Sequence, residues 1–242
     1  MNMVFYGSPG TAKTTVARLI AKIMYDKKMI KRQDVTEVGA SDLVGKYVGW
    51  TAWQVAQIFS QAKGGVLFID EAYSLANKEA GGFNQEAIDA IIKEMENNRK
   101  DTLVILAGYK DKMEDLIKCN PGFKSRISKY ISFPNYSSSE LLKIFDKLCK
   151  DANYTLFEAD KEKIYEKIID YIEKIKDDAQ FGNGRECRTI LENAINTQSK
   201  RLIKCKRPSN NELMTLKYED FAYIDSDNTF DTSKKYKVGF TR

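Results

Sequence analysis

Two patterns of hydrophobic residues divide the chain near Pro134. Before it, short apolar runs alternate with segments whose apolar residues recur about every three to four positions, as in strands alternating with helices. The runs predict strands at residues 3–6, 35–38, 66–69, 103–107 and 130–133. The periodic segments predict helices at residues 13–28, 51–62, 85–98 and 111–118. This alternation predicts a parallel sheet with helices on both faces.

After Pro134 only helical periods are found. Residues 137–140, a serine run ending in Glu140, have the composition of a helix start. Three apolar stripes follow, and residues 216–224 close a small helical bundle. The predicted organisation is therefore an α/β unit over residues 1–134, an all-α unit over 135–224 and a polar tail over 225–242. Because the chain opens on a strand of the kind that is central in such sheets, we expect further sequence upstream in the natural gene product.

The link between the first strand and the first helix has the composition of a phosphate-binding loop. It consists of Gly7, Ser8, Pro9, Gly10, Thr11, Ala12, Lys13 and Thr14, with Thr15 following. Its backbone N–H groups and the helix N-terminus attract phosphate. Lys13 is expected to reach the β- and γ-phosphates, and the Thr14 hydroxyl to ligate Mg²⁺. A chance turn before a helix is the alternative, but the flanking strand and helix favour the phosphate loop.

One position departs from the usual pattern of such loops. Ala12 stands where a glycine normally precedes the lysine. If the backbone there needs a positive φ, the methyl group costs about 1 kcal/mol. The substitution is expected to weaken the loop without abolishing it.

The buried strand predicted at residues 66–69 ends in two acids, Asp70 and Glu71. Acids at the carboxyl end of a parallel strand form the second half of many nucleotide sites. Asp70 would hold Mg²⁺, and Glu71 would orient and deprotonate an attacking water. The alternative is that both acids cap a helix beginning at Ala72. The phosphate loop upstream favours the catalytic interpretation.

The composition narrows the class of protein. Histidine is absent, which excludes histidine-based catalysis and histidine metal ligands. The four cysteines lie far apart, which favours free thiols in a reducing cytoplasm over disulfides or a zinc site. No apolar run approaches the roughly 20 residues of a membrane span, and no signal peptide is recognised. Basic residues outnumber acidic ones after Lys200; a solvated lysine-rich surface is favoured over a nucleic-acid partner.

A glycine-bounded segment, residues 45–49, carries Tyr47 and Val48. The glycines predict a mobile loop, and Tyr47 and Val48 give its tip an apolar surface for binding. A turn in which Tyr47 folds back onto its own domain explains the composition equally well, so both interpretations stay open on local features.

Three further sequence segments add to these motifs. They are residues 47–49 (YVG), residues 64–75 (GGVLFIDEAYSL) and residues 105–109 (ILAGY), and the third is followed downstream by residues 120–123 (NPGF). With the phosphate loop and the helical second half, they resemble the AAA+ ATPases, and among these the CbxX/CfqX family, to which stage V sporulation protein K and the red-type Rubisco activases belong. The resemblance covers residues 3–224. It implies a ring, usually a hexamer, with ATP and Mg²⁺ bound between subunits, and a helical lid subdomain.

The resemblance also implies roles for single residues. Lys13 and Thr14 match the Walker A pair, and Asp70 and Glu71 the Walker B pair. Arg126 matches the arginine finger that reaches a neighbour's γ-phosphate, with a surface ion pair as the alternative. Arg185 matches the lid arginine that contacts nucleotide, and Arg188 lies one turn further on. Tyr47 and Val48 match the pore loop. Tyr109 stands where many AAA+ proteins have a polar sensor, so no residue is assigned to that role.

Together these features predict a cytoplasmic, ring-forming ATP hydrolase that remodels or threads a protein substrate. The first alternative is a nucleotide-gated assembly protein with little turnover. A DNA-acting AAA+ module is the less favoured alternative, since no base-reading motif is found.

Overall fold

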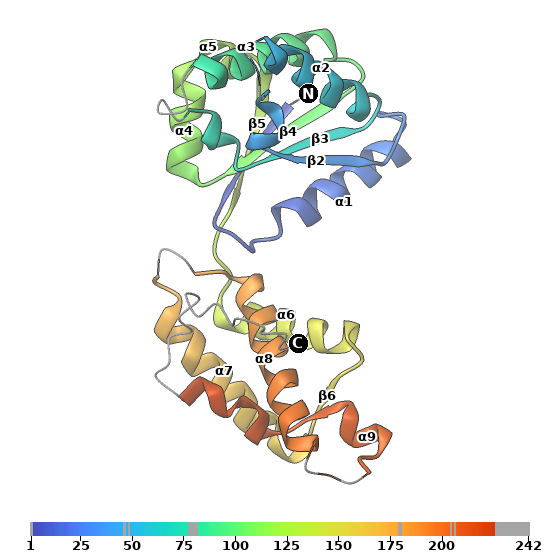
Figure 1. The fold of residues 1–242 in the computed structure, drawn as a ribbon, viewed down its shortest axis with the longest axis vertical. Coiled ribbons are helices and arrows are strands. Elements are labelled where there is room, and N and C mark those ends of the chain that lie inside the picture. Colours follow the sequence, from blue (N-terminus) through green and yellow to red (C-terminus); the bar gives the residue numbers. More distant parts are fainter. Residues whose placement is uncertain are drawn as a thin grey trace, which may run out of the picture. The chain divides into compact units, whose positions relative to one another are not determined.

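The computed structural model describes residues 2–45, 47, 49–76, 82–178, 181–203, 205 and 207–225. Val48 of the predicted pore loop and residues 226–242 of the predicted tail lie outside the described residues. The chain separates into two compact units, Met1–Tyr136 and Ser137–Arg242 (Figure 1).

The first unit is built on five parallel strands. They are β1 (Asn2–Gly7), β2 (Val35–Gly39), β3 (Val66–Asp70), β4 (Leu103–Gly108) and β5 (Ile127–Phe133), in the spatial order β2-β3-β4-β1-β5. The predicted parallel sheet is therefore confirmed. The last strand begins three residues before its predicted start. It is an edge strand, and Ile127 is followed by exposed Ser128 and Lys129, which give no apolar run.

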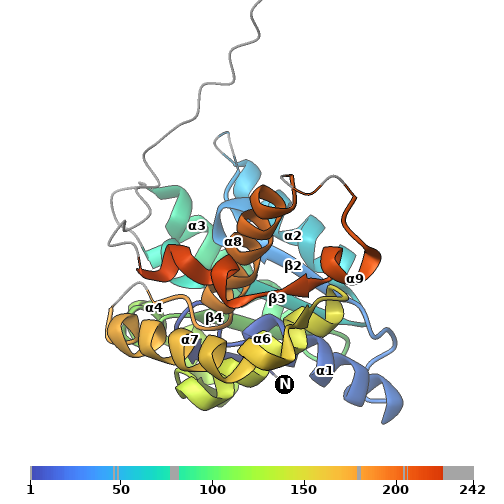
Figure 2. The same cartoon turned by 90° about the horizontal axis from the view of Figure 1, so that it is seen from below.

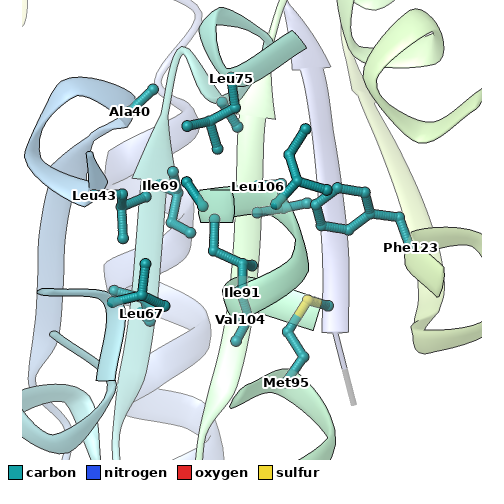
Figure 3. Close-up of a cluster of buried hydrophobic side chains, with 14 of the residues drawn as sticks. Ala40, Leu43, Leu67, Ile69, Leu75, Ile91, Met95, Val104, Leu106 and Phe123 are labelled. Carbon is teal, nitrogen blue, oxygen red and sulfur yellow. The ribbon is translucent and has the colours of Figure 1, made fainter. Parts of the chain in front are cut away.

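The strands β3 and β4 are buried on both faces, which explains why they are almost entirely apolar. Successive side chains of a strand point to opposite faces, so alternate residues enter two different cores. Leu67, Ile69, Val104 and Leu106 enter the core on one face (Figure 3). Val66, Phe68, Leu103, Ile105 and Ala107 enter the core on the other.

Helices cover both faces of this sheet, as predicted. Ala17, Ala21 and Met24 of α1 (Lys13–Asp26) belong to one core. The helices α2 (Trp50–Ala62) and α3 (Gly82–Asn97) supply most of the helical side chains of the other core, and α4 (Lys110–Cys119) lies on the same side (Figure 1).

A short helix that the sequence analysis did not predict, α5 (Pro121–Arg126), precedes β5. Pro121 occupies its first turn, and the Asn120 side chain accepts a hydrogen bond from the Gly122 N–H at 2.8 Å. Both are favourable helix-start features. Phe123 anchors the helix in the core beside α3 (Figure 3).

The second unit contains α6 (Ser138–Asp151), α7 (Lys161–Ile175), α8 (Gly184–Leu202) and α9 (Asn210–Leu213) (Figure 2). The predicted helix start is confirmed: the Ser137 and Glu140 side chains cap α6 reciprocally. A parallel pair of two-residue strands, β6 (Thr155–Leu156) and β7 (Thr215–Leu216), was not predicted. Two residues are too few to give a strand period.

Cys149, Cys187 and Cys205 are free thiols in this structure, and Cys149 and Cys187 are buried. Burial raises the pKa of each of these two thiols to about 12. Among the described residues, no helix has the length and apolar character needed to cross a membrane.

The double burial of β4 gives a stability prediction. Leu106→Ala, at a position with 1% exposure, should lower the free energy of unfolding by about 2–5 kcal/mol because it leaves a cavity in the core. The matched control is Leu19→Ala on α1, a leucine that is 55% exposed, which should change it by less than about 0.5 kcal/mol. Urea unfolding followed by circular dichroism measures both, and equal effects would contradict this packing.

Candidate active site

The predicted phosphate loop leaves the carboxyl end of β1 and enters the first turn of α1. The Lys13 ammonium donates to the carbonyl oxygens of Gly7 at 2.9 Å and Ser8 at 2.8 Å. The Thr11 hydroxyl donates to the same Ser8 oxygen at 2.8 Å, and Thr11 is buried. These bonds wrap the loop around its own lysine. A β-carbon at Gly7 would lie 2.6 Å from the Phe133 carbonyl oxygen, so glycine is needed for this approach.

Two residues of the loop have left-handed backbone conformations, Gly10 with φ 70° and Ala12 with φ 63°. Glycine adopts this region at no steric cost, whereas the methyl group of alanine costs about 1 kcal/mol. The positive φ that makes alanine costly at position 12 is therefore present. The loop carries this strain directly before Lys13, at the N-cap of α1.

Asp70 is the last residue of β3 and Glu71 follows it, so both acids stand at the end of the buried strand as predicted. The Asp70 carboxylate accepts a hydrogen bond from the Glu71 N–H at 3.0 Å. Glu71 is exposed and has φ 48°, a strained conformation for a non-glycine residue. The Glu71 carbonyl accepts from the Ser74 N–H at 2.9 Å, so the chain turns sharply into the 3₁₀ helix Ala72–Ala76. Because of this turn, the backbone changes direction between Asp70, which ends the strand, and Glu71.

Tyr73 connects Glu71 to the end of β4. Burial raises the pKa of the Tyr73 phenol, and the neighbouring Glu71 carboxylate, to which it hydrogen-bonds, raises it further. The Tyr73 ring lies 5.9 Å from that of Tyr109, and the Lys112 ammonium lies 4.7 Å from the Tyr73 ring centre. A β-carbon at Gly108 would lie 2.6 Å from the Tyr73 ring. The missing side chain of Gly108 thus makes room for the Tyr73 ring.

The strand register brings the loop and the acids to the same edge of the sheet. Tyr6 of β1 pairs with Gly108 of β4, and Ile69 of β3 pairs with Leu106 of β4. The phosphate loop and Asp70 therefore leave the carboxyl ends of two strands that flank β4. This is the edge at which ligands bind in open parallel sheets.

The residues at this edge fit Mg²⁺ arriving with a nucleotide. Thr14 supplies a hydroxyl and Asp70 a carboxylate, which are the hard oxygen donors that this ion prefers. Proteins commonly hold Mg²⁺ through one or two such groups, while phosphate oxygens and waters supply the rest.

Arg126 lies at the other end of the sheet. It precedes β5, whose first residue Ile127 pairs with Asn2, whereas Gly7 pairs with Phe133. The six residues of β1 span about 20 Å. Arg126 and the phosphate loop of the same chain are therefore separated by the length of the sheet. The ion pair with an acid, which was the alternative interpretation of Arg126, is present, since its Nε lies 3.4 Å from a Glu96 carboxylate oxygen.

Tyr47 does not fold back into the core. It is 65% exposed, and its ring packs against Trp50 with ring centres 5.4 Å apart. Trp50 contacts Trp53 in turn at 6.0 Å, and both tryptophans are more than half exposed. An exposed aromatic cluster of Tyr47, Trp50 and Trp53 thus lies at the start of α2. Tyr47 was predicted as a candidate from its glycine-bounded segment, and the two tryptophans were not predicted.

The remaining predicted site residues lie on helices. Thr15 is exposed in the first turn of α1. Arg185 and Arg188 are both exposed on α8 of the second unit. Arg185 follows a buried Asn183 with φ 49°, which begins this helix.

Comparison with known proteins agrees with this arrangement. The family described as "ATPase family associated with various cellular activities (AAA)" matches residues 3–135, and the "AAA lid domain" family matches residues 137–231. A solved structure titled as the FIGL-1 AAA domain in complex with ADP superposes with a TM-score of 0.63. That match covers 93% of this chain and 70% of the other at 18% identity, so it supports the fold alone.

Three relatives have closer sequences. Stage V sporulation protein K of Bacillus subtilis is 37% identical over 92% of this chain and 69% of its own length. Protein CfxQ of Xanthobacter flavus is 42% identical over 84% of this chain and 63% of its own. The chloroplastic ribulose bisphosphate carboxylase/oxygenase activase of Cyanidioschyzon merolae is 39% identical over 91% of this chain and 75% of its own. The chain thus spans about two thirds to three quarters of these proteins.

Both units match family models, and these relatives are 37–42% identical over 84–92% of the chain. The chain therefore belongs to the AAA ATPase family, within its CbxX/CfqX group, as the sequence motifs predicted.

Proposed function

We propose that the chain is a cytoplasmic, Mg²⁺-dependent ATP hydrolase that forms a ring and remodels or threads a protein substrate. One observation carries the proposal: the phosphate loop and the Asp70–Glu71 pair leave the same edge of the sheet on either side of β4. The AAA ATPase family supports ATP hydrolysis in general. The ring, the threading and the residue roles are the proposal.

In this mechanism the residues of the loop bind and orient ATP. Lys13 exchanges its bonds to the Gly7 and Ser8 carbonyls for phosphate oxygens, and backbone N–H groups bind the β-phosphate. Thr14 and Asp70 would hold Mg²⁺, which neutralises developing phosphate charge when bound.

Glu71 is the proposed general base. It accepts a proton from water as the water oxygen attacks the γ-phosphorus, and the bond from that phosphorus to the β–γ bridging oxygen breaks to release ADP. The left-handed backbone at Glu71 sets the direction of its side chain, and a fixed direction holds a base in a reactive orientation.

The position of Arg126 supports completion of the site by a second copy. Its own loop lies a sheet length away, so a phosphate within its reach belongs to a neighbouring chain. A trans arginine of this kind can raise the rate by about 10³-fold or more. Arg185 is proposed as the lid arginine that responds to nucleotide, with Arg188 on the same helix as the alternative.

The exposed aromatic cluster of Tyr47, Trp50 and Trp53 is the proposed grip on a polypeptide. Aromatic side chains offer large apolar contact area to substrates of many sequences. Val48 completes the proposed pore loop.

A second candidate is a nucleotide-gated assembly protein with little turnover. The strained Ala12, with φ 63° directly before the catalytic lysine, favours it. A steady-state ATPase assay separates the two candidates.

We expect Glu71→Gln to lower kcat for ATP by at least about 10²-fold while nucleotide binding persists, because the proton acceptor is lost and the phosphate loop is intact. Lys13→Ala should lose nucleotide binding, whereas its matched control Lys22→Ala, an exposed lysine on the same helix, should retain it. Phosphate release and a fluorescent ATP analogue measure the two quantities. Wild-type turnover no higher than that of Glu71→Gln would favour the second candidate.

Tyr47→Ala should leave basal ATP hydrolysis unchanged and abolish its stimulation by an unfolded, tryptophan-free polypeptide, because the grip is lost and the nucleotide site is untouched. Tyr25→Ala, at an exposed tyrosine of α1, is the control and should be stimulated like the wild type. Trp50 and Trp53 are the two tryptophans of the chain, so their fluorescence reports binding at the cluster directly. Full stimulation of Tyr47→Ala would contradict the threading role.

A further inference from the structure

Two nitrogens of the Arg126 guanidinium group, Nη1 and Nε, are held by its own unit. Its Nη1 donates to the Gly122 carbonyl at 3.2 Å and contacts the Ser125 hydroxyl at 3.2 Å. Its Nε lies 3.4 Å from Oε2 of Glu96. This nitrogen is shielded from solvent and forms no regular hydrogen bond within the described part of the chain. Its interaction with Glu96 is therefore an ion pair without a hydrogen bond.

Glu96 is itself fixed by a second arginine. It lies near the end of α3, and its other oxygen, Oε1, accepts a hydrogen bond from Nη1 of Arg99 at 3.0 Å. The two carboxylate oxygens are thus divided between two guanidinium groups. The helices α3 and α5, which bring Glu96 and Arg126 together, pack side by side (Figure 1).

The third guanidinium nitrogen, Nη2, forms no hydrogen bond with any of the described residues. The Arg126 side chain is 27% exposed, so the unit does not enclose it fully. An arginine fork that is already oriented loses little rotamer freedom when it binds phosphate. Fixed positive charge aimed at the position where negative charge develops is also the most effective kind of transition-state stabilisation.

We propose that Glu96 is the positioning residue of Arg126: it pairs with Nε of the guanidinium and leaves Nη2 to contact a phosphate bound by a neighbouring copy. The inference rests on the proposed function, because Arg126 acts there in trans. Arg99 supports the arrangement by fixing the carboxylate. Glu96 therefore contributes to the active site of the neighbouring copy, and its substitution leaves the active site of its own chain intact.

The test measures ATP turnover of the full chain. Glu96→Ala should lower kcat by about tenfold and change KM little, because misplacing a catalytic group costs rate more than ground-state binding. Glu96→Gln, which keeps the size and one acceptor oxygen, should lose less. Glu86→Ala, at another acid of α3, is the matched control and should retain the wild-type rate. Sedimentation checks that all variants assemble equally.

Mixing subunits separates positioning from structural damage. Glu71→Gln copies lack the base but carry an intact Arg126, while Glu96→Ala copies carry an intact base and a misplaced Arg126. In a mixture, the first should supply the arginine to the second, and turnover should rise well above that of either variant alone. Arg126→Ala should be rescued by Glu71→Gln in the same way.

Two results would overturn the positioning role alone. One is full activity of Glu96→Ala beside an impaired Arg126→Ala. The other is an impaired Glu96→Ala that Glu71→Gln does not rescue although it rescues Arg126→Ala, since that defect would lie in the variant's own site. Full activity of Arg126→Ala would instead overturn the trans arginine of the proposed function, and this inference with it.

Discussion

The burial of β3 and β4 on both faces is the constraint on which the rest of the first unit depends. Their alternate residues enter two cores, so helices must cover both sides of the sheet, and strands connected in this way run parallel. Parallel strands bring all their carboxyl ends to one edge. The phosphate loop and the Asp70–Glu71 pair lie close to each other for that reason, although about 60 residues separate them in sequence.

The same constraint sends Arg126 to the opposite edge. An arginine that precedes β5 is at the amino end of the sheet, and no rotamer of its side chain reaches across the strand length to its own loop. In the proposed mechanism, the strained residues at the carboxyl edge act on the nucleotide of their own chain. The charge pair at the amino edge acts on the nucleotide of a neighbouring copy. Ala12 and Glu71 carry the strained backbone at one edge, and Glu96 holds Arg126 at the other.

Much of this fold could be predicted from the sequence because buried parallel strands are unbroken apolar runs, and residues 66–69 and 103–107 are of this kind. The edge strand β5 was predicted only in part, since solvent on one side allows polar residues, and α5 is too short to show a period. Motif spacing identified Lys13 and Glu71 as candidates. Tyr73 and Glu96 were missed, because sequence spacing does not reveal which ring Gly108 accommodates or which acid lies beside Arg126.

The measurement that tests the central claim most directly is ATP turnover per subunit across a wide range of protein concentrations. If a neighbouring copy completes each site, turnover per subunit should rise with concentration and reach a plateau as the chains assemble, because association follows mass action. Turnover that is measurable, lost in Glu71→Gln, and independent of concentration down to fully dissociated chains would contradict the account, since one chain would then suffice for hydrolysis.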